Sequence, residues 1–120
     1  MRGTRVEVDL TALSHNYLAM RASIPESVKI AGIVKANAYG HDLVSIAKKL
    51  ENLGVDYLGV ANIYEAKMLR KNEVTCPILV MGKTFEEDYD IAVKHDITLT
   101  IFDLEDARKL NLNAYYDNKV

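Results

Sequence analysis

Short apolar runs alternate along this chain with longer segments in which apolar residues recur every three or four positions. The short runs are rich in β-branched residues and almost continuously apolar, which is typical of parallel strands covered on both faces. The segments between them have the spacing of amphipathic helices. The runs predict strands at residues 6–10, 28–34, 57–60, 78–81 and 97–102.

Start and stop residues predict five helices among these strands. The first covers about residues 11–23, and the second covers about residues 43–53 with Gly54 as its C-terminal cap. Two of the later starts precede a glutamate by three residues, which is the spacing of a capping box. These starts are Asn62 and Thr84, and the last helix begins near Asp103.

Strand–helix units of about twenty to twenty-five residues predict a parallel α/β fold. Four such units follow residue 28, and Lys119 and Val120 are placed to open a fifth. Four units are half of an eight-unit barrel. A half barrel leaves an open sheet edge on each side and half of its inner face unpacked. At 120 residues the chain is long enough for one modest domain.

The apolar run at residues 28–34 ends abruptly at Lys35, and Tyr39, Gly40 and His41 follow within six residues. A buried strand would deliver the lysine amine to the mouth of a pocket. Burial disfavours the ammonium form, so the position suits a lysine held as a Schiff base. The alternative is a lysine that snorkels to solvent, which is more common at strand ends in general.

The whole string VKANAYGH, residues 34–41, closely resembles the pyridoxal-phosphate lysine segment of the alanine racemases. Further matches occur in the order of that family. Residues 5–10, 12–13 and 15–16 resemble its amino-terminal segment, and Ala61, residues 65–66, 69–70 and 77–82 resemble its next two units. The resemblance implies a TIM-like (β/α)8 barrel followed by a β-rich second domain. It implies that residues 1–120 are the amino-terminal part of that barrel domain, with residues 1–10 forming a strand that pairs with the second domain.

The resemblance also assigns roles to residues. Lys35 would bind pyridoxal 5'-phosphate and act as one proton base, the Tyr39 hydroxyl would bond the cofactor phosphate, and Met81 would lie beside the cofactor. From the pattern alone, packing of a loop against the sheet is favoured for Tyr39, and Met81 is equally well understood as a core residue. His41 is expected to be structural. Asp42 stands where the family has glycine, and it would either cap the second helix or alter phosphate affinity.

Other parts of the family's site have no counterpart in these residues. The second base is a tyrosine from the second domain of the partner subunit, and arginines support the pyridine nitrogen and the phenolic oxygen. We therefore expect a homodimer for the full-length form, and an isolated chain that self-associates and is inactive.

Composition narrows the remaining function classes. The net charge is -2 without a basic run, so nucleic acid is a poor partner. We expect no membrane span, no metal site and a cytoplasmic location, because the chain lacks long apolar stretches, a signal-peptide pattern and metal-ligand spacing. The one cysteine, Cys76, excludes an internal disulfide and is expected to be a buried structural thiol.

The leading hypothesis is an alanine racemase that interconverts L- and D-alanine for peptidoglycan precursors. The first alternative is a related barrel enzyme for another amino acid, either a racemase or, less compatible with the Tyr-Gly-His continuation, a decarboxylase. The second alternative is a module that binds the cofactor without catalysis. Substrate choice is not readable from these residues.

Overall fold

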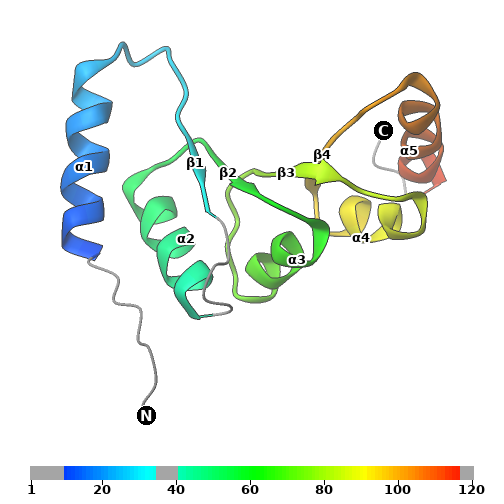
Figure 1. Ribbon diagram of the computed structural model, residues 1–120, viewed down its shortest axis with the longest axis horizontal. Helices are drawn as coiled ribbons and strands as arrows, with labels where there is room; N and C mark the ends of the chain where they lie inside the picture. Colours follow the sequence, from blue (N-terminus) through cyan, green and yellow to red (C-terminus); the bar gives the residue numbers. More distant parts are fainter. Residues whose placement is uncertain (1–9, 35–40, 117–120) are drawn as a thin grey trace.

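The computed structural model describes residues 10–34 and 41–116, with backbone only for residues 41 and 42. Four parallel strands form one sheet in the order β1-β2-β3-β4, and helices alternate with them (Figure 1). The elements in chain order are α1 (Leu10–Ser23), β1 (Ala31–Ile33), α2 (His41–Leu53), β2 (Tyr57–Val60), α3 (Ile63–Lys71), β3 (Ile78–Lys83), the 3-10 turn η1 (Glu86–Asp88), α4 (Tyr89–Lys94), β4 (Ile97–Thr100) and α5 (Leu104–Tyr116). The predicted run of four βα units is confirmed.

The two faces of the sheet differ in burial. Helices α2, α3 and α4 lie along one face, whereas α1 and α5 stand at the two ends (Figure 1). The side chains that meet these helices are fully buried and form the centre of the core, namely Leu58, Val60, Ile78 and Val80. On the other face Ile33 is 51% exposed and Met81 is 43% exposed. The open inner face expected of a half barrel is therefore present, and the expectation that both faces are covered is wrong for these residues.

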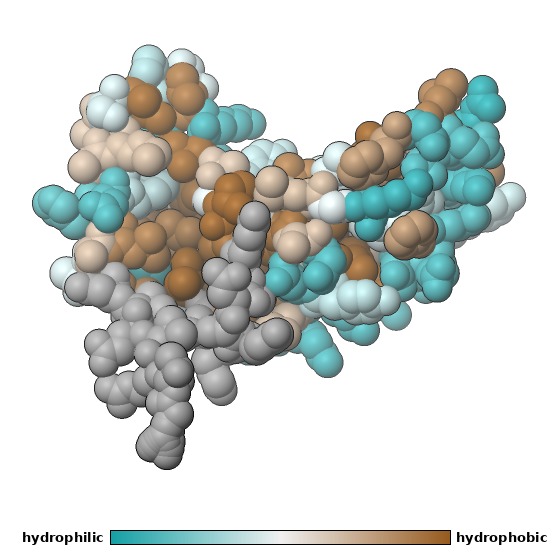
Figure 2. All heavy atoms as spheres, viewed as in Figure 1, coloured by the Kyte–Doolittle hydropathy of each residue, from teal (hydrophilic) through white to brown (hydrophobic). Residues whose placement is uncertain are grey.

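Apolar residues gather over the middle of the molecule, between the end that carries α1 and the more polar end that carries α5 (Figure 2). The molecule is also flat, with extents of 44 × 43 × 24 Å. Both features agree with a sheet whose second face has no layer of its own among the described residues.

Three strands have bounds that differ from the prediction. β1 begins at Ala31 rather than at residue 28, because Val28 belongs to a turn in which its N–H donates to the Pro25 carbonyl at 3.0 Å. β3 continues two residues further than predicted, to Lys83, and β4 ends two residues earlier, at Thr100. The predicted strand at residues 6–10 lies outside the described residues, except that Leu10 begins α1.

Helix ends follow the local chemistry in most cases. The Asn62 side chain accepts bonds from the N–H groups of Tyr64 and Glu65 at 3.0 Å each, which confirms it as the cap of α3. Gly54 adopts a φ of 94°, the left-handed conformation expected after α2. α2 already includes Asp42, so that residue is in the first turn rather than at the cap.

The predicted helix start at Thr84 is wrong. Thr84 is 6% exposed, and its hydroxyl has no hydrogen-bond partner among the described residues. The chain first makes the turn η1, and α4 begins at Tyr89. The longer β3 explains the difference, because it ends directly before Thr84, whose side chain is buried and caps no helix.

Side chains join successive units at the amino edge of the sheet, where the strands begin. The Asp56 carboxylate, just before β2, accepts the N–H of Ile30 at 2.7 Å. The Glu51 carboxylate of α2 accepts both N–H groups of Thr75 and Cys76, at 2.7 Å each, at the entry to β3. Hydrogen bonds of this kind fix where each strand enters the sheet.

Arg70 of α3 makes the largest set of these bonds. Its guanidinium donates to four backbone carbonyls at 2.8 to 2.9 Å, two before β3 and two before β4. These carbonyls belong to Val74, Cys76, His95 and Asp96. One side chain therefore fixes the entry of two neighbouring strands.

Helices long and apolar enough to cross a membrane are absent from the described part of the chain.

Candidate active site

The carboxyl ends of parallel strands meet at one edge of the sheet, and in the sequence the predicted lysine comes two residues after the last residue of β1. Val34, the residue before it, is 4% exposed, and its N–H donates to the Gly59 carbonyl of β2 at 2.8 Å. The end of β1 is thus buried and bonded to β2. Lys35 and Tyr39, two of the three predicted site residues, lie outside the described residues.

Met81, the third predicted site residue, lies on the open face of the sheet. It does not end β3 as predicted. The register between β3 and β4 shifts between Val80 and Lys83, so Met81 lies in a β-bulge. Bulges of this kind re-aim side chains at the rims of barrels and beside active sites. Met81 is 43% exposed among the described residues, so whether it lies beside a cofactor or packs in a core stays a prediction.

Met81 meets the end of β1 above a glycine. A Cβ atom placed on Gly59 would lie 2.7 Å from Cδ1 of Ile33 and 3.2 Å from Sδ of Met81. The two side chains, from the strands on either side of β2, therefore pack over the space that a side chain at Gly59 would fill. We call Ile33, Gly59 and Met81 the apolar shelf.

The shelf fits a flat aromatic group such as the pyridine ring of pyridoxal phosphate. Ile33 and Met81 are both partly exposed, so they present apolar surface that such a ring would cover. Ile33 also precedes Val34 and Lys35 in the chain, so the shelf adjoins the strand that leads to the predicted lysine.

A second glycine brings the carboxyl ends of β2 and β3 close together. A Cβ on Gly82 would lie 2.7 Å from the carbonyl oxygen of Ala61, and the Gly82 N–H donates to that oxygen at 3.1 Å. The opposing atom belongs to the backbone, so any side chain at Gly82 would push the two strands apart. Gly82 therefore holds the bulge that contains Met81 against β2.

Charged and aromatic side chains follow the shelf along the same edge. The Lys83 amine lies 3.5 Å from the Asp106 carboxylate and 5.7 Å from the ring centre of Phe85. The Tyr64 hydroxyl donates to the Asp88 carboxylate at 3.1 Å, and this bond raises the pKa of Tyr64 above its ordinary value. Both aromatic rings are exposed.

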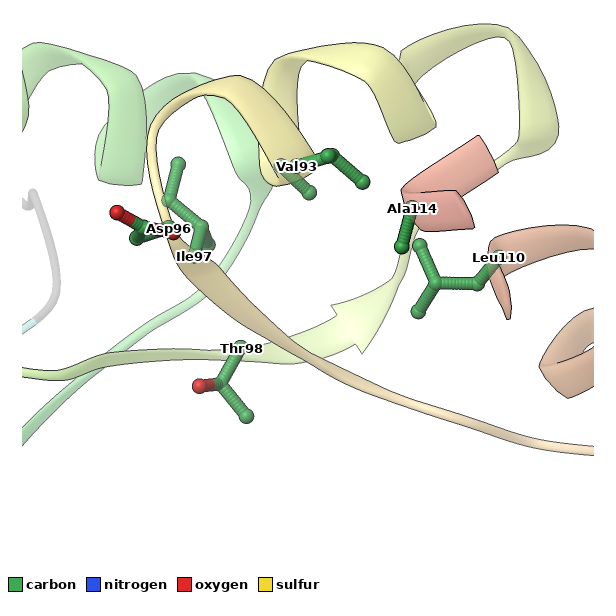
Figure 3. Close-up of a pocket in the computed structure, with 7 residues that line it drawn as sticks. Val93, Asp96, Ile97, Thr98, Leu110 and Ala114 are labelled. Atoms are coloured by element: carbon green, nitrogen blue, oxygen red, sulfur yellow. The ribbon is translucent and has the colours of Figure 1, made fainter. Parts of the chain in front are cut away.

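The described residues also line a hollow of about 340 Å³ away from this edge (Figure 3). It lies between α4, the start of β4 and α5. Leu110 and Ala114 of α5 face Val93 across it, and the carboxylate of Asp96 points away from them. Its lining is mostly apolar, and its one carboxylate, on Asp96, does not point toward the α5 side, so we assign the hollow no role in catalysis. Groups of three or more metal-ligating side chains are absent from the described ranges.

Comparison with known proteins gives the family. The sequence profile described as "Alanine racemase, N-terminal domain" matches residues 8–119. The chain belongs to this family. Within it, "Alanine racemase 1" of Caldanaerobacter subterraneus subsp. tengcongensis is 41% identical over 119 residues, which are 99% of this chain and 31% of that protein. The alanine racemase of Geobacter sulfurreducens is 41% identical over 92% of this chain and 29% of its own length. The chain thus spans less than a third of these curated relatives.

Solved structures of alanine racemases share the fold. An alanine racemase of Clostridium difficile 630 superposes with a TM-score of 0.84 at 41% identity, over 91% of this chain and 29% of that one. A histidine racemase from Leuconostoc mesenteroides subsp. sake superposes with a TM-score of 0.75 at 26% identity, over 88% of this chain and 28% of that one. The predicted family and the predicted part of a racemase barrel are confirmed.

Sequence reasoning missed the shelf residues Ile33 and Gly59. The alternation within residues 57–60 places Gly59 on the face opposite Leu58 and Val60, so a signal existed for which face it occupies. That Ile33 and Met81 meet above it depends on the pairing register of three strands, which the sequence does not display. The side chains of His41 and Asp42 lie outside what the structure describes, so the structural role of His41 and an effect of Asp42 on phosphate affinity stay predictions, whereas the cap position is excluded for Asp42 because α2 already includes it.

Proposed function

We propose that these residues form the amino-terminal part of an alanine racemase in which Lys35 carries pyridoxal 5'-phosphate. One observation carries the proposal: the string VKANAYGH begins with Val34, the buried residue at the end of β1, in a chain of the alanine racemase N-terminal domain family. The parallel sheet supports it, because enzymes with such barrels place their chemistry at the carboxyl edge. A cytoplasmic location and the supply of D-alanine for peptidoglycan are part of the proposal.

In this proposal each residue has a separate task. Lys35 holds the cofactor through its side-chain amine, the Tyr39 hydroxyl donates a hydrogen bond to the phosphate, and the apolar shelf packs against the ring. When bound, the cofactor supplies an electron sink for the negative charge that develops at Cα of the amino acid. The Lys35 amine would take or return the Cα proton on one face of the substrate.

Racemisation also requires a proton donor on the opposite face of Cα. The family resemblance places it on a tyrosine from the second domain of a partner subunit. We therefore propose that the active form is a homodimer, and that the shelf faces only one side of the substrate.

The assignment of Lys35 is tested by trapping the cofactor in the full-length protein. Borohydride reduction followed by peptide mapping should find the pyridoxyl group on Lys35, and Lys35→Ala should lose the label. Lys29→Ala, which changes an exposed lysine six residues earlier, is the matched control and should keep it. Label on Lys29, Lys48 or Lys83 would overturn the assignment.

The likeness to a histidine racemase supports one second candidate, a racemase of a different amino acid. Assays of D-isomer formation from a panel of L-amino acids separate the two. Alanine should give the highest kcat/KM. A protein that takes up the cofactor on Lys35 but racemises no amino acid would instead be the non-catalytic module.

A further inference from the structure

Gly59 contributes to the shelf in two ways. Its carbonyl accepts the N–H of Val34 at 2.8 Å, directly before Lys35 in the chain. Its missing side chain leaves the space into which Ile33 and Met81 fold. It is also paired with Ile33 in the register of β1 and β2. Gly59 thus holds the end of β1 in place and also determines how closely Ile33 and Met81 lie to β2.

We propose that Gly59 is a positioning residue for the cofactor, a role that rests on the proposed function of Lys35. The absence of a side chain at Gly59 keeps Ile33 and Met81 low over β2, so that a ring attached through Lys35 lies on them without being pushed from the sheet. Gly59 acts through these two side chains and does not take part in the chemistry.

The physical argument concerns which atoms must move when a methyl group is added. In Gly59→Ala the new Cβ would lie 2.7 Å from Cδ1 of Ile33, a separation that real Cβ atoms essentially never show. That Cδ1 atom is the end of a flexible, half-exposed side chain, so it gives way rather than the backbone. It has only the open face to move into, which is the face that the ring would cover.

A matched control exists one strand away. A Cβ on Gly32 would lie 2.8 Å from Cδ1 of Leu50, also at the end of a flexible side chain. Gly32 is in β1 and points toward the helices, whereas Gly59 points toward the open face. The two alanine variants therefore add the same atom with nearly the same clash on opposite faces of the same sheet.

The experiment compares Gly59→Ala and Gly32→Ala in the full-length protein. The readouts are the dissociation constant for pyridoxal phosphate and the circular dichroism of the bound cofactor, together with the thermal midpoint. We expect Gly59→Ala to weaken binding about threefold to tenfold, corresponding to one side chain forced from its preferred rotamer, and to change the dichroism. Gly32→Ala should keep the dissociation constant within about twofold of wild type and leave the dichroism unchanged, while it lowers the thermal midpoint.

Adding Ile33→Val to Gly59→Ala should restore binding, because valine lacks the Cδ1 atom. If the two alanine variants bind the cofactor equally, Gly59 is structural and the inference is wrong. A wild-type protein that takes up no cofactor overturns the proposed function and this inference together. Should Gly59→Ala fail to fold, Ile33→Ala tests the same surface without a clash. Weaker binding there supports the inference, and unchanged binding overturns it.

Discussion

Glu51 joins two units of the sheet through a single carboxylate. Burial alone would raise the pKa of Glu51, but hydrogen bonds from Thr75 and Cys76 and the nearby Arg70 charge outweigh it and lower the pKa. The same contact affects the single cysteine. Burial first, and then the Glu51 charge, raise the pKa of the Cys76 thiol, which agrees with a structural rather than a nucleophilic role.

We predict that Glu51 contributes stability that is lost in acid. Because its pKa is lower in the folded protein than its ordinary value of 4.5, the contribution is complete above that value. It disappears as the pH falls through the folded pKa, where the carboxylate becomes protonated. Urea unfolding from about pH 7 to about pH 3 should show a smaller loss of stability for Glu51→Gln than for wild type.

The control for this measurement is Glu26→Gln, which alters an exposed carboxylate between α1 and β1. It should leave the pH dependence of wild type unchanged. A Glu51→Gln profile that runs parallel to wild type over the whole range would contradict the prediction.

At the scale of single elements, the cap of α3 is the clearest case in which a sequence signal and the structure agree. Asn62→Ala removes the oxygen that accepts two N–H groups of the first turn. We expect a loss of about 1 kcal/mol in the free energy of unfolding, measured by denaturant titration. Asn52→Ala changes an exposed asparagine inside α2 and should stay within about 0.5 kcal/mol of wild type. Equal effects of the two variants would mean that the cap adds nothing.

The two predicted capping boxes had different outcomes for a physical reason. Asn62 follows β2, which ends at residue 60 as predicted, and its side chain caps α3. Thr84 follows a strand that continues through the bulge at Met81 and Gly82, and its side chain is buried. Capping-box spacing depends on neighbouring residues and is readable from sequence. A bulge depends on the partner strand and is not.

At the scale of the whole molecule, the number and order of the units were predictable because each strand and helix carries its own apolar period. The family assignment was predictable because it rests on one continuous string, residues 34–41. The open second face followed from counting four units of an eight-unit barrel, whereas the apolar runs by themselves indicated strands covered on both faces. The shelf requires three strands in register, so it became visible only in the structure.

We predict that residues 1–120, prepared alone, self-associate and have no measurable racemase activity. The exposed apolar face favours association, and so do the outer edges of β1 and β4, which pair with no further strand among the described residues. Loss of a catalytic base alone lowers a rate by about 10²–10⁴-fold, and the resemblance gives this chain only one of the two bases. Light scattering tests the self-association, and an alanine racemisation assay with added cofactor tests the lack of activity. A monomer that interconverts L- and D-alanine would contradict both.

The four carbonyls held by Arg70 have a consequence for laboratory evolution of this fold. Arg70, together with Glu51 and Asp56, secures the places where strands enter the sheet, whereas the shelf lies toward the opposite edge. Libraries that vary the segments after the strands would therefore sample new binding surfaces on a frame that stays assembled. In random libraries, variants that replace Arg70 would lose the bonds that hold the entries of β3 and β4. Such variants would be lost through misfolding before any selection for activity began. Tolerance to mutation is thus distributed unevenly along the sheet, and it is greatest where new specificity would arise.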